Sequence, residues 1–130
     1  MASCEKALLP VLLVEDLPDD AFFIERALKE GGVRADLVTV SDERPFRAAL
    51  ATAPPAIVLT DHRMPRFSAW QVIDIVLRTA PGVPVVVVTG AMREEDETEA
   101  LRRGASAVVR KEDLAPLAGI VRRLVAGVAR

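Results

Sequence analysis

Short apolar segments alternate with longer amphipathic segments along the whole chain. The apolar segments are rich in β-branched residues and are predicted to be strands, at residues 9–14, 36–40, 56–60, 84–89 and 107–110. Residues 57–59 and 85–88 show no polar alternation, which is typical of central parallel strands covered by helices on both faces. Residues 36–40 are more mixed and are expected at an edge of the sheet.

The amphipathic segments are predicted to be helices, and capping, charged and helix-breaking residues mark their ends. Asp19 and Asp20 open the first, which ends at the glycines 31–32. Ser68 can cap another, which closes at residues 81–82. The inward side chains of that helix are expected to be Trp70, Ile73, Val76 and Leu77.

Two further helices and one weaker prediction complete the pattern. Residues 94–99 load the beginning of one helix with acids, and Gly104 ends it after two arginines, an arrangement that matches the helix dipole. An apolar stripe over residues 114–125 marks the final helix. Residues 45–52 carry the weakest helical pattern. Five strand–helix units predict a single doubly wound parallel sheet with right-handed crossovers.

Composition and charge narrow the class of protein. The chain has 130 residues, of which 51% are hydrophobic, enough for one domain with a core over about residues 8–126. A net charge of −2 recruits neither nucleic acid nor an anionic membrane. A single cysteine excludes an internal disulfide and fits a reducing compartment. Because no N-terminal apolar run is long enough to span a bilayer, a cytoplasmic protein without membrane insertion is expected.

Polar residues lie at the carboxyl ends of the predicted strands. In doubly wound sheets, ligands bind at these ends. Glu15 and Asp16 follow the first strand, and Asp61 follows the third. Thr89 ends the fourth strand, and Lys111 follows the fifth. In the flavodoxin-like order 2-1-3-4-5 the first and third strands are neighbours, so the three carboxylates are expected to converge.

Three carboxylates close together repel one another, so keeping all of them ionised costs free energy unless a cation neutralises them. Mg²⁺ suits them, because it is held by one or two carboxylates together with water and phosphate oxygens. Lys111 and Thr89 add a positive charge and a hydroxyl donor on the other side of Asp61. Such a site can hold an anion against one carboxylate, which is what phosphoryl transfer needs.

At this point the chain resembles a known family, the response-regulator receiver domain of two-component signalling. The resemblance covers essentially the whole chain and rests on four signatures in the expected order, at residues 11–16, 57–65, 86–90 and 111. It implies that Asp61 is the phosphoacceptor. It also implies that Asp16 binds Mg²⁺ with Asp61 and the backbone carbonyl of Arg63, while Glu15 acts largely through metal-bound water.

The resemblance further implies that Thr89 and Lys111 contact the phosphoryl oxygens. The phosphoryl group would come from a sensor histidine kinase or a phosphotransfer protein, and the protein would turn over no external substrate. A homodimer through the last two helices is a further expectation. The chain would be either a stand-alone receiver or one domain of a longer protein.

Three departures from the family pattern concern the output rather than phosphoacceptance. Ala69 stands where many receivers have glycine, and Glu112 replaces the proline that usually follows the lysine. The Lys111–Glu112 peptide is therefore predicted to be trans, because a cis bond without proline costs roughly 3 kcal/mol. Val108 occupies the position of the switch aromatic, and the chain has no tyrosine.

Some residues keep two interpretations. Glu15 is either an outer acid of the metal site or a solvated surface acid. His62 is interpreted as a gatekeeper or a solvated loop residue, and Trp70 as helix core or a subunit contact.

Other classes of protein fit less well. A haloacid-dehalogenase phosphatase would need a second aspartate at position 63, and a nucleotide-binding module would need a glycine-rich loop where the acidic segment 17–20 stands. The remaining rival is a receiver-like module that is never phosphorylated and works by partner docking or dimerisation.

Overall fold

The predicted parallel sheet is present. The computed structural model describes residues 8–90 and 92–128 of the chain, and side chains up to residue 126. Its strands are β1 Leu9–Val14, β2 Ala35–Val40, β3 Ile57–Thr60, β4 Val85–Thr89 and β5 Ala107–Arg110. All pairings are parallel and the order is β2-β1-β3-β4-β5, so the doubly wound, flavodoxin-like topology is confirmed.

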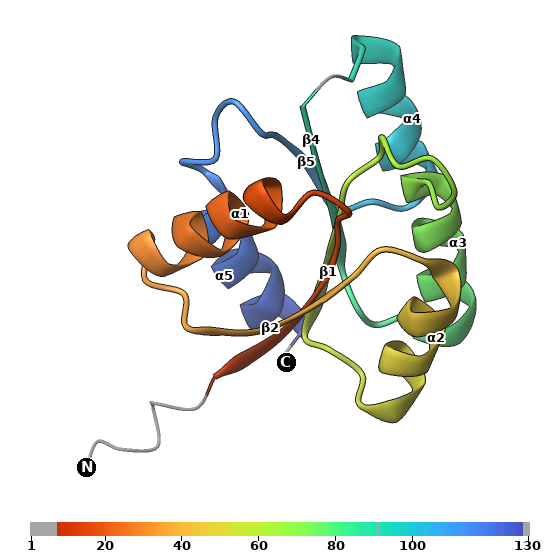
Figure 1. Ribbon diagram of the computed structural model, residues 1–130, viewed down its shortest axis with the longest axis horizontal. Coiled ribbons are helices and arrows are strands. Elements are labelled where there is room, and N and C mark those ends of the chain that lie inside the picture. Colours follow the sequence, from red (N-terminus) through yellow and green to blue (C-terminus); the bar gives the residue numbers. More distant parts are fainter. Residues whose placement is uncertain (1–7, 91, 129–130) are drawn as a thin grey trace.

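Five helices cover the sheet in two layers. They are α1 Pro18–Glu30, α2 Glu43–Thr52, α3 Ala69–Thr79, α4 Glu94–Arg103 and α5 Leu117–Val128. Figure 1 shows α1 and α5 on one face of the sheet and α2, α3 and α4 on the other. The segment with the weakest helical pattern is helical as α2, and α5 begins three residues later than its apolar stripe. No helix within the described ranges is both long and apolar enough to cross a bilayer.

The central strands are apolar except for the threonines at the ends of β3 and β4, because both of their faces are covered. Successive side chains of a strand point to opposite faces. In β1, Val11 and Leu13 therefore join the cluster beneath α1 and α5, whereas Leu12 and Val14 join the cluster beneath the other three helices. All four side chains are at most 2% exposed. The mixed segment β2 lies at an edge, as predicted.

The beginning of α3 matches its sequence signal, but one inward side chain was wrongly predicted. Ser68 accepts a hydrogen bond from the Gln71 backbone, and the Gln71 side chain accepts one from the Ser68 backbone, which forms a capping box. Leu77 is 47% exposed, while Val72 and Ile75 are buried instead. The buried stripe of α3 is therefore rotated relative to the predicted one.

Two glycines allow close approaches between elements. A Cβ at Gly31 would lie 2.3 Å from the Cβ of Ala118, so the end of α1 packs directly against α5. Gly104 ends α4 with φ +124°, a conformation that side chains disfavour.

The Lys111–Glu112 peptide is trans as predicted, in keeping with the absence of cis bonds from the part of the chain that the structure describes.

Candidate functional site

The sheet itself holds the backbone of the predicted site residues. The Asp61 N–H donates to the Val14 carbonyl oxygen at 2.9 Å, and the Lys111 N–H donates to the Thr89 carbonyl oxygen at 3.0 Å. Each bond extends a parallel ladder one residue beyond its strand. The Asp61 and Lys111 side chains therefore leave from hydrogen-bonded backbone at the carboxyl edge of the sheet.

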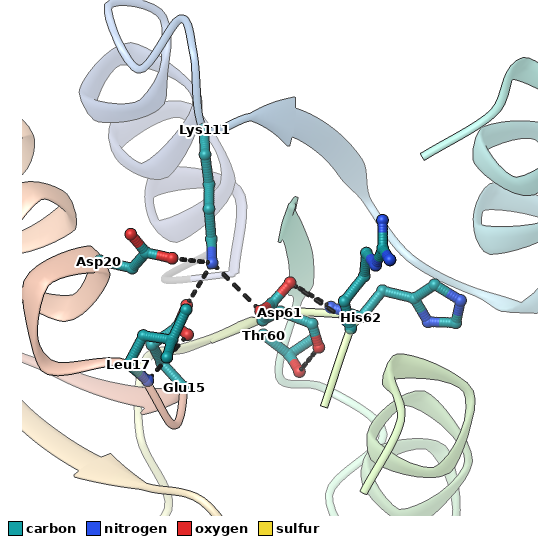
Figure 2. A network of polar contacts seen from close by, with 8 residues as sticks. Glu15, Leu17, Asp20, Thr60, Asp61, His62 and Lys111 are labelled. Atoms are coloured by element: carbon teal, nitrogen blue, oxygen red, sulfur yellow. Dashed lines mark hydrogen bonds and ion pairs between the residues drawn. The ribbon is translucent and has the colours of Figure 1, made fainter. Parts of the chain in front are cut away.

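Lys111 lies at the centre of a group of carboxylates (Figure 2). Its Nζ donates hydrogen bonds to Asp20 Oδ2 at 2.7 Å and to Asp61 Oδ2 at 3.1 Å. It also forms an ion pair with Glu15 Oε1 at 2.8 Å. The Lys111 side chain is 16% exposed, so it is no ordinary surface cation. Asp20 was missed by the sequence analysis, which explained it as an acid at a helix start.

The two carboxylate oxygens of Asp61 have different surroundings. Oδ1 accepts hydrogen bonds from the backbone N–H groups of His62 at 2.7 Å and Arg63 at 3.2 Å. Oδ2 faces Lys111 (Figure 2). Asp61 is only 3% exposed, so these contacts set the orientation of its carboxylate at the sheet edge.

Glu15 is buried rather than solvated, which excludes its interpretation as a surface acid. It is 3% exposed, and its Oε2 accepts a hydrogen bond from the Leu17 N–H at 3.2 Å. Burial raises the pKa of Glu15; Lys111 opposes this rise, and the negative charge of Asp61 adds to it. Burial alone would lower the pKa of Lys111, but its contacts with Asp20, Glu15 and Asp61 outweigh burial and raise that pKa. Lys111 therefore carries its charge at neutral pH.

The predicted acidic cluster is present. Glu15, Asp16 and Asp61 each offer one carboxylate oxygen, and these oxygens lie within 4.8 Å of one another. Asp16 is exposed, whereas the other two acids are buried. Hard oxygen ligands at this spacing fit a divalent cation such as Mg²⁺.

Thr89 differs from the other buried threonine at this edge. The hydroxyl of Thr60 donates to the Asp61 carbonyl oxygen at 2.8 Å, a contact that the sequence analysis missed. The hydroxyl of Thr89 is fully buried and has no hydrogen-bond partner among the described residues. Buried polar atoms are normally paired, so this hydroxyl is available for a ligand oxygen.

His62, next to Asp61, joins an aromatic stack that reaches α3 and α4. Its ring centroid lies 4.4 Å from that of Trp70, and the Arg103 guanidinium lies 4.9 Å from the Trp70 ring. Figure 2 shows the imidazole on the opposite side of Asp61 from Lys111. His62 is half-buried, and burial lowers its pKa. It is therefore a packed residue rather than a freely solvated one.

Arg110 ties the end of β5 to the segment after β4. Its guanidinium donates to the Met92 carbonyl oxygen at 3.1 Å and pairs with Glu97 of α4. Val108, on the same strand, is half-buried against the core. An open cleft of about 670 Å³ lies beside Arg110, lined by His62, Arg63, Met92, Arg93, Asp96 and Arg110.

Comparison with known proteins agrees with this arrangement. Residues 11–122 match the family model of the response regulator receiver domain. Nitrogen assimilation regulatory protein NtrX of Azorhizobium caulinodans is 29% identical over 103 residues, which cover 78% of this chain and 22% of that protein. The chain thus spans about a fifth of the length of this curated relative.

Solved structures show the same fold. The receiver domain of a signal transduction histidine kinase from Syntrophus aciditrophicus superposes with a TM-score of 0.78 at 26% identity, covering 93% of this chain and 92% of that one. The receiver domain of NtrX from Brucella abortus also gives 0.78, at 24% identity, covering 89% and 98%. The family match covers most of the sheet and the site at its carboxyl edge, and we conclude that the chain belongs to the response regulator receiver domain family.

Proposed function

We propose that this protein is the phosphoacceptor of a two-component phosphorelay and that Asp61 carries the phosphoryl group. One observation supports this above all others. Asp61 is 3% exposed, and its carboxylate is held by two backbone N–H groups at one oxygen and faced by the Lys111 ammonium at the other. A carboxylate positioned in this way is prepared for in-line attack on an electrophile.

The donor is a sensor histidine kinase or a phosphotransfer protein. A carboxylate oxygen of Asp61 forms a bond to phosphorus while the P–N bond of the donor phosphohistidine breaks, and the electron pair of that bond stays on the imidazole. Lys111 balances the charge of the phosphoryl oxygens, and the Thr89 hydroxyl donates a hydrogen bond to one of them. Preorganised charges and donors of this kind carry most of the catalysis of phosphoryl transfer.

The acidic cluster suits one Mg²⁺, held by Asp16, Asp61 and the backbone carbonyl of Arg63, with Glu15 acting through water. The fit rests on three carboxylate oxygens within 4.8 Å of one another. When bound there, the cation would neutralise charge on the carboxylates and the phosphoryl group. Asp16→Asn should weaken Mg²⁺ binding measured by calorimetry.

We further propose that the protein turns over no external substrate, works in the cytoplasm without binding nucleic acid, and passes its state to a partner or an attached domain. A homodimer through α4 and α5 is one route for that output. The alternative is an interaction module that is never phosphorylated, and the absence of a ring at Val108 is the observation that favours it.

Phosphoryl uptake separates the two functions. We would incubate the protein and its Asp61→Asn variant with Mg²⁺ and acetyl phosphate and measure intact masses. The wild type should gain one hydroxylamine-sensitive phosphoryl group and the variant none, while both unfold alike in urea. An unmodified wild type would support the interaction module, and hydroxylamine-sensitive phosphate on Asp61→Asn would overturn the assignment of Asp61.

A further inference from the structure

We infer that Asp20 is a positioning residue, which holds the Lys111 ammonium from the first turn of α1 while Asp61 is phosphorylated. The inference rests on the proposed function and assigns a role to a residue that the receiver signatures of this sequence do not include. Its starting point is the shortest contact of Lys111. Nζ lies 2.7 Å from Asp20 Oδ2, compared with 2.8 Å to Glu15 and 3.1 Å to Asp61.

Both partners in this contact are partly withdrawn from water. The side chains of Asp20 and Lys111 are 30% and 16% exposed. An ammonium group has three N–H donors, and here it has three carboxylate neighbours (Figure 2). The ammonium therefore lies between α1 and the sheet edge rather than in solvent, which restricts a side chain that is otherwise flexible.

The three partners of Lys111 differ in what the reaction does to them. Asp61 changes chemically, because one of its oxygens becomes bonded to phosphorus. Glu15 belongs to the acidic cluster, where a cation would compete with Lys111 for its oxygens. Asp20 lies outside that cluster and is not the phosphoacceptor. It is therefore the partner that can keep the same contact with Lys111 before, during and after phosphoryl transfer.

Asp20 could act only by stabilising the beginning of α1, and the neighbouring Asp19 provides a matched control for that role. Asp19 and Asp20 both lie in the first turn of α1, where negative charge is stabilised by the helix dipole. Asp19 is exposed, while the ion pairs of Lys111 are formed with Glu15, Asp20 and Asp61. A change at Asp19 therefore tests the helix contribution, and the same change at Asp20 tests the Lys111 contact as well.

The experiment measures the rate of phosphoryl uptake from acetyl phosphate with Mg²⁺. In this step the new bond joins an Asp61 oxygen to phosphorus, and the P–O bond to the acetyl group breaks as acetate leaves with its electron pair. Asp20→Asn should slow uptake roughly tenfold, because Lys111 loses its anchor. Asp19→Asn should stay within about twofold of the wild type, and Asp20→Glu should recover part of the loss. Urea unfolding should be alike for the two asparagine variants.

A double-mutant cycle shows whether Asp20 acts through Lys111. In a Lys111→Gln background, Asp20→Asn should cause no further slowing, because the contact is already absent. The inference would be overturned if the Asp20→Asn variant took up phosphoryl groups as fast as Asp19→Asn, or faster than the wild type. It would also be overturned if Asp20→Asn slowed uptake by the same factor with and without Lys111. If the wild type takes up no phosphoryl group, the proposed function fails and the inference fails with it. A failure of the inference alone leaves wild-type uptake intact.

Discussion

Two parts of the site around Asp61 are built differently. In the first, which we call the lysine flank, Lys111 contacts the carboxylates of Asp20, Glu15 and Asp61 at 2.7–3.1 Å. The second, which we call the threonine flank, consists of Thr89 at the end of β4 and residues 90, 92 and 93, which follow it along the chain. The Thr89 hydroxyl is buried there without a hydrogen-bond partner among the residues described.

The difference indicates that the two flanks have different roles. The lysine flank has its contacts in place before any phosphoryl group arrives, which is electrostatic preorganisation. The threonine flank contains a buried polar atom whose desolvation is uncompensated. A phosphoryl oxygen would supply the missing partner. Because a ligand shifts a two-state element only by its differential interaction with the two states, the threonine flank is the better candidate for the switch.

The largest expected effect follows from removing the charge of the lysine flank. Lys111→Gln should lower the rate of phosphoryl uptake by about 10²-fold or more, the scale observed when one preorganised donor is removed from an active site. Rates from acetyl phosphate measure it, with Arg66→Gln as the control, since Arg66 is an exposed cation in the loop after Asp61. A loss no greater for Lys111→Gln than for Arg66→Gln would contradict the role of this flank.

A smaller effect is expected on the threonine flank, and there stability and uptake should move in opposite directions. Thr89→Val should slow uptake roughly tenfold while raising the free energy of unfolding by about 1 kcal/mol, because it removes an unpaired buried hydroxyl. Thr60→Val is the matched control. Its hydroxyl is equally buried but donates to the Asp61 carbonyl oxygen, so its loss should cost about 1 kcal/mol.

Urea unfolding of both valine variants checks this prediction. Equal destabilisation by the two substitutions would show that Thr89 has a partner in solution. The contrast between the flanks would then lose its main support.

The smallest expected effect concerns the pH dependence of stability. Burial raises the pKa of Glu15 in the folded state above its usual value of 4.5. A raised pKa in an acid means that ionisation disfavours the folded state. The contribution of Glu15 to stability is thus fully present below pH 4.5 and declines as the pH rises through its folded-state pKa.

Glu15→Gln isolates this contribution, because glutamine does not titrate. In the absence of divalent cations, the free energy of unfolding of the wild type relative to Glu15→Gln should fall as the pH rises above 4.5. Urea unfolding at several pH values measures the difference. A difference that rises with pH would mean that the ion pair with Lys111 outweighs burial.

The sequence predicted the fold and the backbone positions of the site, because both follow from periodic patterns. Strand order and the apolar runs place Asp61 and Lys111 at one edge of a parallel sheet. The contact between Asp20 and Lys111 joins residues 91 positions apart, and it depends on how α1 lies against the segment after β5. No local pattern encodes that distance.

The burial of Glu15 and the aromatic packing of His62 could not be predicted from the sequence for a related reason. Whether Glu15 is solvated depends on the elements that cover it. The stack of His62 on Trp70 depends on the path of the loop between β3 and α3. The exposure of Leu77 follows from a rotation of α3 about its axis, which an apolar stripe of this width does not define.

The fifth strand is expected to contribute little to the switch. Val108 is half-buried against the core and has no ring that could move between two positions. Its side chain therefore offers little difference in free energy between the two states. Any response should lie in the loop after Thr89 and in α4, to which Arg110 is bonded through Met92 and Glu97.

Amide hydrogen exchange with and without beryllofluoride, in the presence of Mg²⁺, tests the contrast between the flanks most directly. Beryllofluoride stands in for the phosphoryl group on Asp61. We predict that protection changes are confined to the loops after Asp61 and Thr89, while the amides of β5 and Lys111 keep their exchange rates. Large changes centred on residues 107–110 would show that the switch runs through the fifth strand and would contradict the account.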